Sequence, residues 1–279
     1  MTTIVVPVDG SPFAERALRP ACSLAVRLDG ARVLLVQCAV EDTTSARRWL
    51  DDRVSLYSDV VDVDSLLVEH GDPVEVIEEA VGAEPDSTLC MATRGRSGLG
   101  VAVLGSVATE VVCRSQRPLV LVGPSCRTAM LPGERGRVLM TSDGSEFSNG
   151  ILPTASSWAH RLQLTPWLTE VVGPDEDPEP AHRRHPNREI EAAVDRLRDL
   201  ATRFDARSAR PDVEVLHGDP ARSIASLAER LPAGMIISAT HGRSGLTRIA
   251  LGSVANDVVR HAPCPVLVER PIVGSGGDS

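Results

Sequence analysis

Short apolar runs alternate along this chain with stretches whose apolar residues have the spacing of an amphipathic helix. Apolar strands between helical segments are typical of a parallel sheet covered by helices on both faces. The pattern predicts strands at 3–8, 32–38, 62–68, 87–92 and 118–122, with helices beginning near Pro12, Ser45, Pro73 and Leu104. It predicts a second series of strands at 137–142, 164–171, 212–217, 234–239 and 265–269, with helices beginning near Glu146, Asn187, Pro220 and Leu251.

The two series are copies of one unit. IVVPVDGSPFAERAL at 4–18 pairs with VLMTSDGSEFSNGIL at 138–152, and the segments 91–112 and 238–259 agree at 14 of 22 positions. Self-similarity of this length indicates a duplicated supersecondary unit. We therefore expect an α/β fold of two tandem, open, parallel five-stranded sheets with helices on both faces, Rossmann-like in arrangement. The expected domains are 1–127 and 134–279.

The second copy is longer than the first between its second and third strands. The 13 extra residues belong to the polar, proline-rich segment 173–186. Its His182 and His185 are either a metal site or, as the composition favours, part of a solvated loop. The helix near 187–205 has an apolar stripe that should pack on the sheet, formed by Ile190, Val194, Leu197 and Leu200. Only a short counterpart, near 45–57, is expected in the first copy.

Composition narrows the class of protein. The 279 residues are 42% hydrophobic and 24% charged, as in soluble globular proteins of two ordinary domains. No apolar run reaches the ~18 residues of a membrane helix, and the strand at 3–8 has no basic segment before it. We therefore expect a cytoplasmic protein without a membrane partner. A net charge of −9 with 3% aromatic residues argues against a nucleic-acid partner.

Lysine is missing from the chain, because all 29 basic residues are arginine. This excludes the phosphate-binding lysine of a P-loop, and it excludes any lysine nucleophile or Schiff base. If phosphates bind to this chain, backbone N–H groups, hydroxyls and arginine must hold them.

The repeated glycine-serine loops have the residues of an anion site. In open α/β sheets, ligands lie beyond the carboxyl ends of the strands. The loops after the first and fourth strands of each copy should therefore form one crevice. Gly105-Ser106 and Gly252-Ser253 fall at helix starts, where unpaired N–H groups and the helix dipole favour an anion. A plain capping role for these pairs is the alternative.

Other residues of the same loops suit a phosphate ligand. Gly95 and Gly242 permit close approach of the backbone because they have no Cβ. Positive charge can come from Arg94, Arg96 and Arg243. Three or four charge-assisted hydrogen bonds of about 1.5–3 kcal/mol each would suffice for micromolar affinity. Asp9 and Asp143, after the first strand of each copy, are either site residues or plain turn residues.

The motifs in combination resemble a known family. PVDGS at 7–11, GDP before the third helix, and A-T-[RH]-G followed nine residues later by G-S look like the universal stress protein family. The resemblance covers both copies, so the chain is similar to a tandem universal stress protein. It implies a five-stranded parallel sheet of the adenine-nucleotide α-hydrolase-like kind, adenine-nucleotide binding, and pairing of units through their last strands. The implied cofactor is ATP, with an accompanying Mg²⁺ left open.

The resemblance also implies which residues meet the nucleotide. Asp9 and Asp143 would lie near ribose, phosphates or metal, and Cys38 would meet adenine through its backbone. In the second copy TPWLTEVV aligns ambiguously, so no counterpart of Cys38 is named. The contacts expected in the first copy are Pro7, Asp9, Cys38, Ala92, Arg94, Gly95, Arg96, Gly105, Ser106 and Val107. Those expected in the second are Thr141, Asp143, Ala239, Gly242, Arg243, Gly252, Ser253 and Val254.

Two alanines depart from the family's nucleotide signature, which is G-x-x-G, nine residues, then G-[ST]. Ala92 and Ala239 stand where the first glycine is expected. If that position needs a positive φ, alanine costs about 1–3 kcal/mol. If φ is negative, a methyl group near the ribose can be tolerated.

These observations favour a regulatory stress-response protein that binds ATP in one or both copies. One alternative is an interaction protein of the same fold, with empty loops or with AMP or cyclic AMP. Another is a weak ATPase or a protein that phosphorylates itself on Ser106 or Ser253. No acid–base pair, nucleophile set or metal cluster is recognised, so no catalytic residue is assigned.

Two kinds of protein contact are expected. The last strands, 119–122 and 266–268, should pair within the chain as an internal pseudo-dimer, because pairing covers strand edges that would otherwise be exposed. A homodimer of whole chains is a further expectation.

Overall fold

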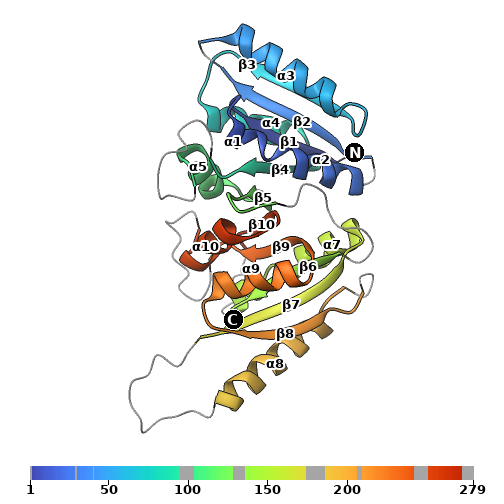
Figure 1. Ribbon diagram of the computed structural model, residues 1–279, viewed down its shortest axis with the longest axis vertical. Helices are drawn as coiled ribbons and strands as arrows, with labels where there is room; N and C mark the ends of the chain where they lie inside the picture. Colours follow the sequence, from blue (N-terminus) through green and yellow to red (C-terminus); the bar gives the residue numbers. More distant parts are fainter. Residues whose placement is uncertain are drawn as a thin grey trace, which may run out of the picture.

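The computed structural model describes residues 2–28, 30–39, 41–94, 104–127, 136–173, 186–205, 209–241 and 251–271. Within these residues, ten strands form one sheet in the order β3-β2-β1-β4-β5-β10-β9-β6-β7-β8 (Figure 1). The strands are β1 (Thr3–Val8), β2 (Arg32–Cys38), β3 (Val63–Val68), β4 (Ser87–Ala92), β5 (Leu119–Val122), β6 (Arg137–Ser142), β7 (Thr165–Val172), β8 (Asp212–His217), β9 (Ala233–Ala239) and β10 (Val266–Glu269).

Helices cover both faces of the sheet (Figure 1). They are α1 (Pro12–Glu15), α2 (Leu18–Arg27), α3 (Thr43–Tyr57), α4 (Pro73–Ala83), α5 (Ser106–Arg114), α6 (Glu146–Asn149), α7 (Leu152–Leu162), α8 (Pro186–Thr202), α9 (Pro220–Arg230) and α10 (Ser253–His261). On one face α2, α3, α7 and α8 pack into a shared apolar core. On the other face α4, α5, α9 and α10 pack into a second core.

The α/β class and the two five-stranded parallel units are confirmed. Every strand begins and ends within one residue of its predicted bounds. The alternation of apolar runs was sufficient for this, because strands buried on both faces leave continuous apolar segments in the sequence. The apolar stripe predicted after the insertion also packs on the sheet, since Leu197 and Leu200 of α8 are buried in the core.

The helices differ from the prediction in three respects. The first helix of each copy is divided, into α1 and α2 and into α6 and α7. The helices expected near Leu104 and Leu251 begin two residues later, because Gly105 and Gly252 are extended N-cap residues. The expectation of only a short counterpart to α8 is wrong, since α3 has 15 residues and α8 has 17.

The two units join edge to edge in the middle of the sheet (Figure 1). β5 and β10 pair antiparallel, with Leu121 opposite Val266 and Val120 opposite Leu267. This confirms the predicted internal pseudo-dimer through the last strands. Both apolar cores contain residues of both units, so the junction is part of the hydrophobic interior.

Local sequence fixes the helix starts beside the carboxyl ends of the strands. Asp72 and Asp219 cap α4 and α9, each followed by proline at the first helical position. Ser11 and Ser145 cap α1 and α6 through their hydroxyl oxygens. In the described part of the chain, no helix has both the length and the apolar character required to span a bilayer.

Candidate functional site

A cavity lies in the first unit at the carboxyl ends of β1 and β4. These two strands are neighbours in the sheet, which brings the loops that follow them together. The cavity has a volume of about 260 Å³. It is lined by Pro7, Val8, Asp9, Ala14, Val36, Cys38, Pro73, Val76, Ile77, Met91, Ala92, Thr93, Arg94, Gly105, Ser106, Val107 and Ala108. We call this the first cavity.

An equivalent cavity lies in the second unit, where β6 and β9 are neighbours. Its volume is about 350 Å³. It is lined by Thr141, Ser142, Asp143, Ser148, Val171, Pro220, Ile224, Ser238, Ala239, His241, Gly252, Ser253, Val254 and Ala255. We call this the second cavity. The duplication in the sequence is therefore a duplication of a cavity.

The amino ends of α5 and α10 line one side of each cavity. The N–H of Gly105 donates to the Thr93 carbonyl at 2.7 Å, and the N–H of Gly252 donates to the Thr240 carbonyl at 2.7 Å. Neither helix has a hydrogen bond from an N-cap side chain to the amides of its first turn, because both N-cap residues are glycine. Backbone N–H groups at such a helix end are suited to an anion.

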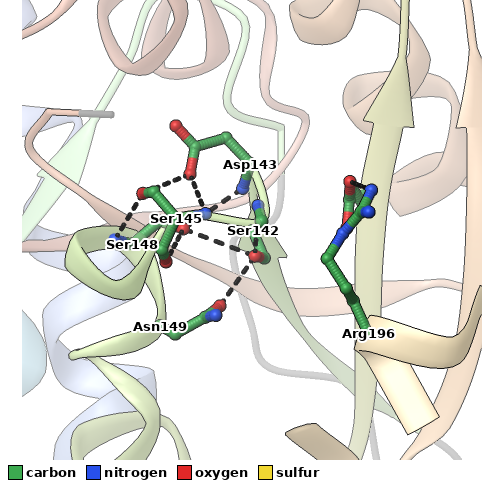
Figure 2. A network of polar contacts seen from close by, with 8 residues as sticks. Ser142, Asp143, Ser145, Ser148, Asn149 and Arg196 are labelled. Atoms are coloured by element: carbon green, nitrogen blue, oxygen red, sulfur yellow. Dashed lines mark hydrogen bonds and ion pairs between the residues drawn. The ribbon is translucent and has the colours of Figure 1, made fainter. Parts of the chain in front are cut away.

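The aspartate after the first strand of each unit is held by its own turn. Asp9 accepts from the Ser11 N–H at 2.9 Å, and Asp143 accepts from the Ser145 N–H at 3.0 Å. The Ser145 hydroxyl also donates to Asp143, at 2.6 Å (Figure 2). The intervening glycines, at positions 10 and 144, have φ of 77° and 80°, a conformation that favours glycine.

The second cavity has a polar network that the first cannot form. Ser142 Oγ accepts from the Gly144 N–H at 2.9 Å and donates to Asn149 at 2.7 Å, while Ser148 Oγ accepts from the Asp143 N–H at 3.2 Å (Figure 2). At the positions of these three side chains the first unit has Val8, Glu15 and Ala14. The second aspartate loop is thus braced by the hydroxyls of Ser142 and Ser148, which Val8 and Ala14 do not have.

An ion pair supports the second aspartate loop from the opposite side. Arg196 of α8 donates to Glu170 of β7, and Glu170 is only 3% exposed. The hydrogen bond to Glu170, together with its charge, raises the pKa of Arg196. A Cβ on Gly144 would lie 3.0 Å from Arg196 Nε, so the guanidinium packs directly against the turn. Gln37, also buried, is the counterpart of Glu170 in the first unit.

The cavities contain every described residue that the sequence and the resemblance singled out. Around the first cavity these are Pro7, Asp9, Cys38, Ala92, Arg94, Gly105, Ser106 and Val107. Around the second they are Thr141, Asp143, Ala239, Gly252, Ser253 and Val254. Gly95, Arg96, Gly242 and Arg243 lie outside the described residues, as do His182 and His185. Among the described residues, no group of three or more His, Cys, Asp or Glu could hold a metal ion.

The backbone dihedral angles show whether Ala92 and Ala239 stand at positions that need a positive φ. Among the described residues other than glycine, only Gln163 and Pro232 have a positive φ. Ala92 and Ala239 end β4 and β9 with ordinary strand geometry. The positive-φ penalty therefore does not apply at either position.

Strand register identifies the residue that the sequence left ambiguous. Gln37 lies opposite Val8 in the first unit, and Glu170 lies opposite Ser142 in the second. The next residues, Cys38 and Val171, are therefore equivalent, and each lines its own cavity. Pro220 and Ile224 of α9 were also missed. Their equivalence to Pro73 and Ile77 was visible in the sequence, because HGDP occurs at 70–73 and again 147 residues later at 217–220.

The Cys38 thiol lines the first cavity. Its sulfur donates to the Gly71 carbonyl at 3.4 Å. Burial, and then the negative charge of Asp72, raise the pKa of this thiol. Cys38 is therefore a thiol and not a thiolate at neutral pH, and the Gly71 carbonyl accepts its single S–H.

Comparison with known proteins agrees with this geometry. The model of the universal stress protein family matches residues 1–123 and again residues 134–270. A universal stress protein of Mycolicibacterium smegmatis is 30% identical over 187 residues, which are 64% of this chain and 60% of that protein. The universal stress protein Mb2028c of Mycobacterium bovis is 29% identical over 210 residues, 71% of this chain and 64% of that protein. The matches thus span less than two thirds of these relatives' length.

Solved structures share the fold over almost the whole chain. A universal stress protein from Archaeoglobus fulgidus has a TM-score of 0.63 at 19% identity, covering 97% of this chain and 98% of that one. One from Pseudomonas aeruginosa, described as putative, has a TM-score of 0.64 at 18% identity, with coverage of 96% and 93%. The two family matches and the two equivalent cavities lead to the same conclusion: the chain belongs to the universal stress protein family and is a tandem of two of its units.

Proposed function

We propose that each unit binds an adenine nucleotide, with ATP as the principal ligand, and that the chain acts as a regulatory protein in a stress response. The observation that carries this proposal is the pair of equivalent cavities, each of which joins an uncapped helix amino end to an apolar chamber. A nucleotide has the matching two parts, an anionic tail and a flat, largely apolar base.

The helix end supplies the affinity for the tail. The amides of the first turn and the hydroxyl of Ser106 or Ser253 are available to phosphate oxygens, since these residues line the cavities. Three or four charge-assisted hydrogen bonds of about 1.5–3 kcal/mol each offset the cost of association to leave roughly micromolar binding. Arg94 adds positive charge in the first cavity.

The opposite end of each cavity suits the base. In the first cavity Val36, Ile77 and Met91 form an apolar wall. Apolar walls with a few convergent polar groups are typical of small-molecule sites. Each cavity also has one aspartate, Asp9 or Asp143. One protein carboxylate is enough to bind Mg²⁺ when nucleotide phosphates and water complete its coordination.

Isothermal titration of the full chain with ATP tests the proposal. We expect two sites in the natural chain, one in Gly105→Val or Gly252→Val, and none when both changes are combined. The fold should tolerate these changes, since a Cβ at Gly105 lies 3.6 Å from its nearest neighbour and one at Gly252 lies 3.4 Å. Gly82→Val is the control, because a Cβ at Gly82 meets nothing within 4 Å and the residue is outside both cavities.

Other outcomes separate the alternatives. The absence of both heat and a thermal shift at millimolar ATP would contradict ATP binding. Full stoichiometry in the double variant would contradict the site. The same titration with AMP and cyclic AMP distinguishes a protein that prefers those ligands. Release of ADP, or phosphate on Ser106 or Ser253 found by mass spectrometry, would indicate a weak ATPase or autophosphorylation.

A further inference from the structure

The two cavities differ in charge at one position beside the helix end. The residue after Thr93 is Arg94, and the residue after Thr240 is His241. The carbonyl of each threonine accepts the N–H of the N-cap glycine at 2.7 Å. This hydrogen bond holds the following residue against the amino end of α5 or α10.

Distances to the N-cap glycines place both residues. A Cβ on Gly105 would lie 4.0 Å from Arg94 Cα, and a Cβ on Gly252 would lie 3.6 Å from His241 Cα. The imidazole itself is next to the glycine, since the same Cβ would be 3.9 Å from its Cδ2 atom. Arg94 lines the first cavity and His241 lines the second.

The described residues at the two helix starts are the same in both units. Each has glycine, serine, valine and alanine in sequence at the helix start, and one aspartate across the cavity. An arginine is charged at every pH of interest. A histidine has an ordinary pKa of about 6.5, so it gains its charge only as the pH falls. Among the described residues that line the two cavities, the difference in cationic charge is therefore at residues 94 and 241.

The groups around His241 act on its charge in opposite directions. Its Nδ1 lies 3.1 Å from the Thr240 hydroxyl, and the side chain is buried, which favours the neutral ring. Asp143 lines the same cavity, and Glu269 ends the neighbouring strand β10, where its carbonyl accepts from the Thr240 N–H. The Asp143 carboxylate in the same cavity, and above all an incoming phosphate, favour the imidazolium, whereas the Glu269 side chain hydrogen-bonds to Thr154.

We propose that residues 94 and 241 set the ligand charge that each cavity selects. Arg94 makes the first cavity prefer a triphosphate over a monophosphate across the neutral range. His241 makes the second cavity discriminate weakly at pH 8, and the preference grows as the pH falls towards 6. The inference rests on the proposed nucleotide binding and adds a specificity determinant to it.

The ratio of ATP affinity to AMP affinity measures this preference in each cavity separately. The Gly252→Val chain reports the first cavity, and the Gly105→Val chain reports the second. At pH 8 we expect the ratio to be about tenfold larger in the first cavity, because a charge-assisted hydrogen bond is added there. Between pH 8 and pH 6 the ratio should rise in the second cavity and change little in the first.

The two cavities serve as controls for each other. Protonation of the nucleotide phosphates near pH 6 affects both cavities alike, so only the difference between them reports the protein. Arg94→His in the first cavity should introduce the pH dependence, and His241→Arg in the second should remove it. His241→Gln keeps a neutral polar side chain and should fix the second cavity in its weakly discriminating state.

Three results would overturn the inference and leave nucleotide binding intact. They are equal ratios in the two cavities at pH 8, parallel pH profiles, and ratios that do not respond to the reciprocal substitutions. Absence of ATP and AMP binding in both chains would overturn the proposed function and, with it, this inference.

Discussion

Gly123 and Val259 are in closer contact than a side chain at position 123 would permit. A Cβ on Gly123 would stand 1.9 Å from the Val259 carbonyl oxygen and 3.0 Å from its carbonyl carbon. Gly123 follows β5 of the first unit, and Val259 belongs to α10 of the second. The contact therefore connects the end of β5, the last strand of the first unit, to α10. The amino end of α10 lines the second cavity.

Gly123→Ala should destabilise the protein. The added methyl group overlaps backbone atoms, so the chain or the helix must shift, and overpacking of this kind costs about 1–3 kcal/mol. Urea denaturation should show a lower midpoint. Gly82→Ala is the matched control, since its Cβ has open space and alanine favours the helix interior by about 0.5–1 kcal/mol. Equal effects of the two changes would contradict the close contact.

The shared cores predict that the two units unfold together. Leu121→Ala, at a fully buried position of the junction, should cost about 2–5 kcal/mol. Trp49 reports the first unit and Trp158 the second, so single-tryptophan variants can follow each unit by fluorescence. We expect coincident transitions that shift by the same amount. Leu56→Ala, where the leucine is 61% exposed, should change neither, and separate transitions would show independent units.

Cys38 offers a chemical footprint of the first cavity. Alkylation by iodoacetamide requires the thiolate, and burial raises the pKa of Cys38. Its labelling should therefore be slow at pH 7.5. The rate should rise with pH, but at higher pH values than for an exposed cysteine. ATP should slow labelling of Cys38 further, because the nucleotide would cover the cavity.

The other cysteines are internal references in the same experiment. Cys113 is exposed on α5 and should label at the same rate with and without ATP. Burial raises the pKa of Cys22 to about 11, so it should stay unlabelled in the folded chain. Peptide mass spectrometry resolves each site. Slowing of Cys113 and Cys38 by equal factors would show a global effect of ATP in place of a footprint.

Arg196→Met should destabilise the second unit and loosen its aspartate loop. It leaves the carboxylate of Glu170 buried without its guanidinium, at a cost of about 1–3 kcal/mol given that the Arg196 side chain is 42% exposed. Thermal unfolding measures the loss. The double variant Glu170→Gln/Arg196→Met should recover much of it, because Gln37 is the buried residue at the equivalent position of the first unit. If the double variant recovers no stability, the loss in Arg196→Met does not come from the buried, unpaired carboxylate of Glu170.

Much of the fold could be predicted from the sequence, because its information is local. Apolar strands such as β1 and β9 are buried along their length, and Asp72-Pro73 has the form of a helix start. The pairing of β5 with β10 was also predictable, since two apolar edges within one chain cover each other. The division of the first helix was not predictable from the apolar pattern, which continues through both α1 and α2.

Some residues of the candidate site could also be predicted from the sequence, and others could not. Gly105 and Ser106 were recognised because the repeat placed them at a helix start. Val171 was missed because only strand register shows which residue of β7 stands beside Glu170, and a shift of one residue would face the other side of the sheet. The support that Arg196 gives to Gly144 is a contact between distant segments, and no local pattern carries it.

The antiparallel pairing of β5 with β10 has a consequence for how the two cavities relate to each other. When two separate chains pair, their association weakens on dilution, and every substitution appears in both partners. Here the partners are covalently tethered, so their pairing is independent of protein concentration. One cavity can also change without its neighbour, and the arginine and histidine at residues 94 and 241 are a difference that a dimer of identical subunits cannot carry.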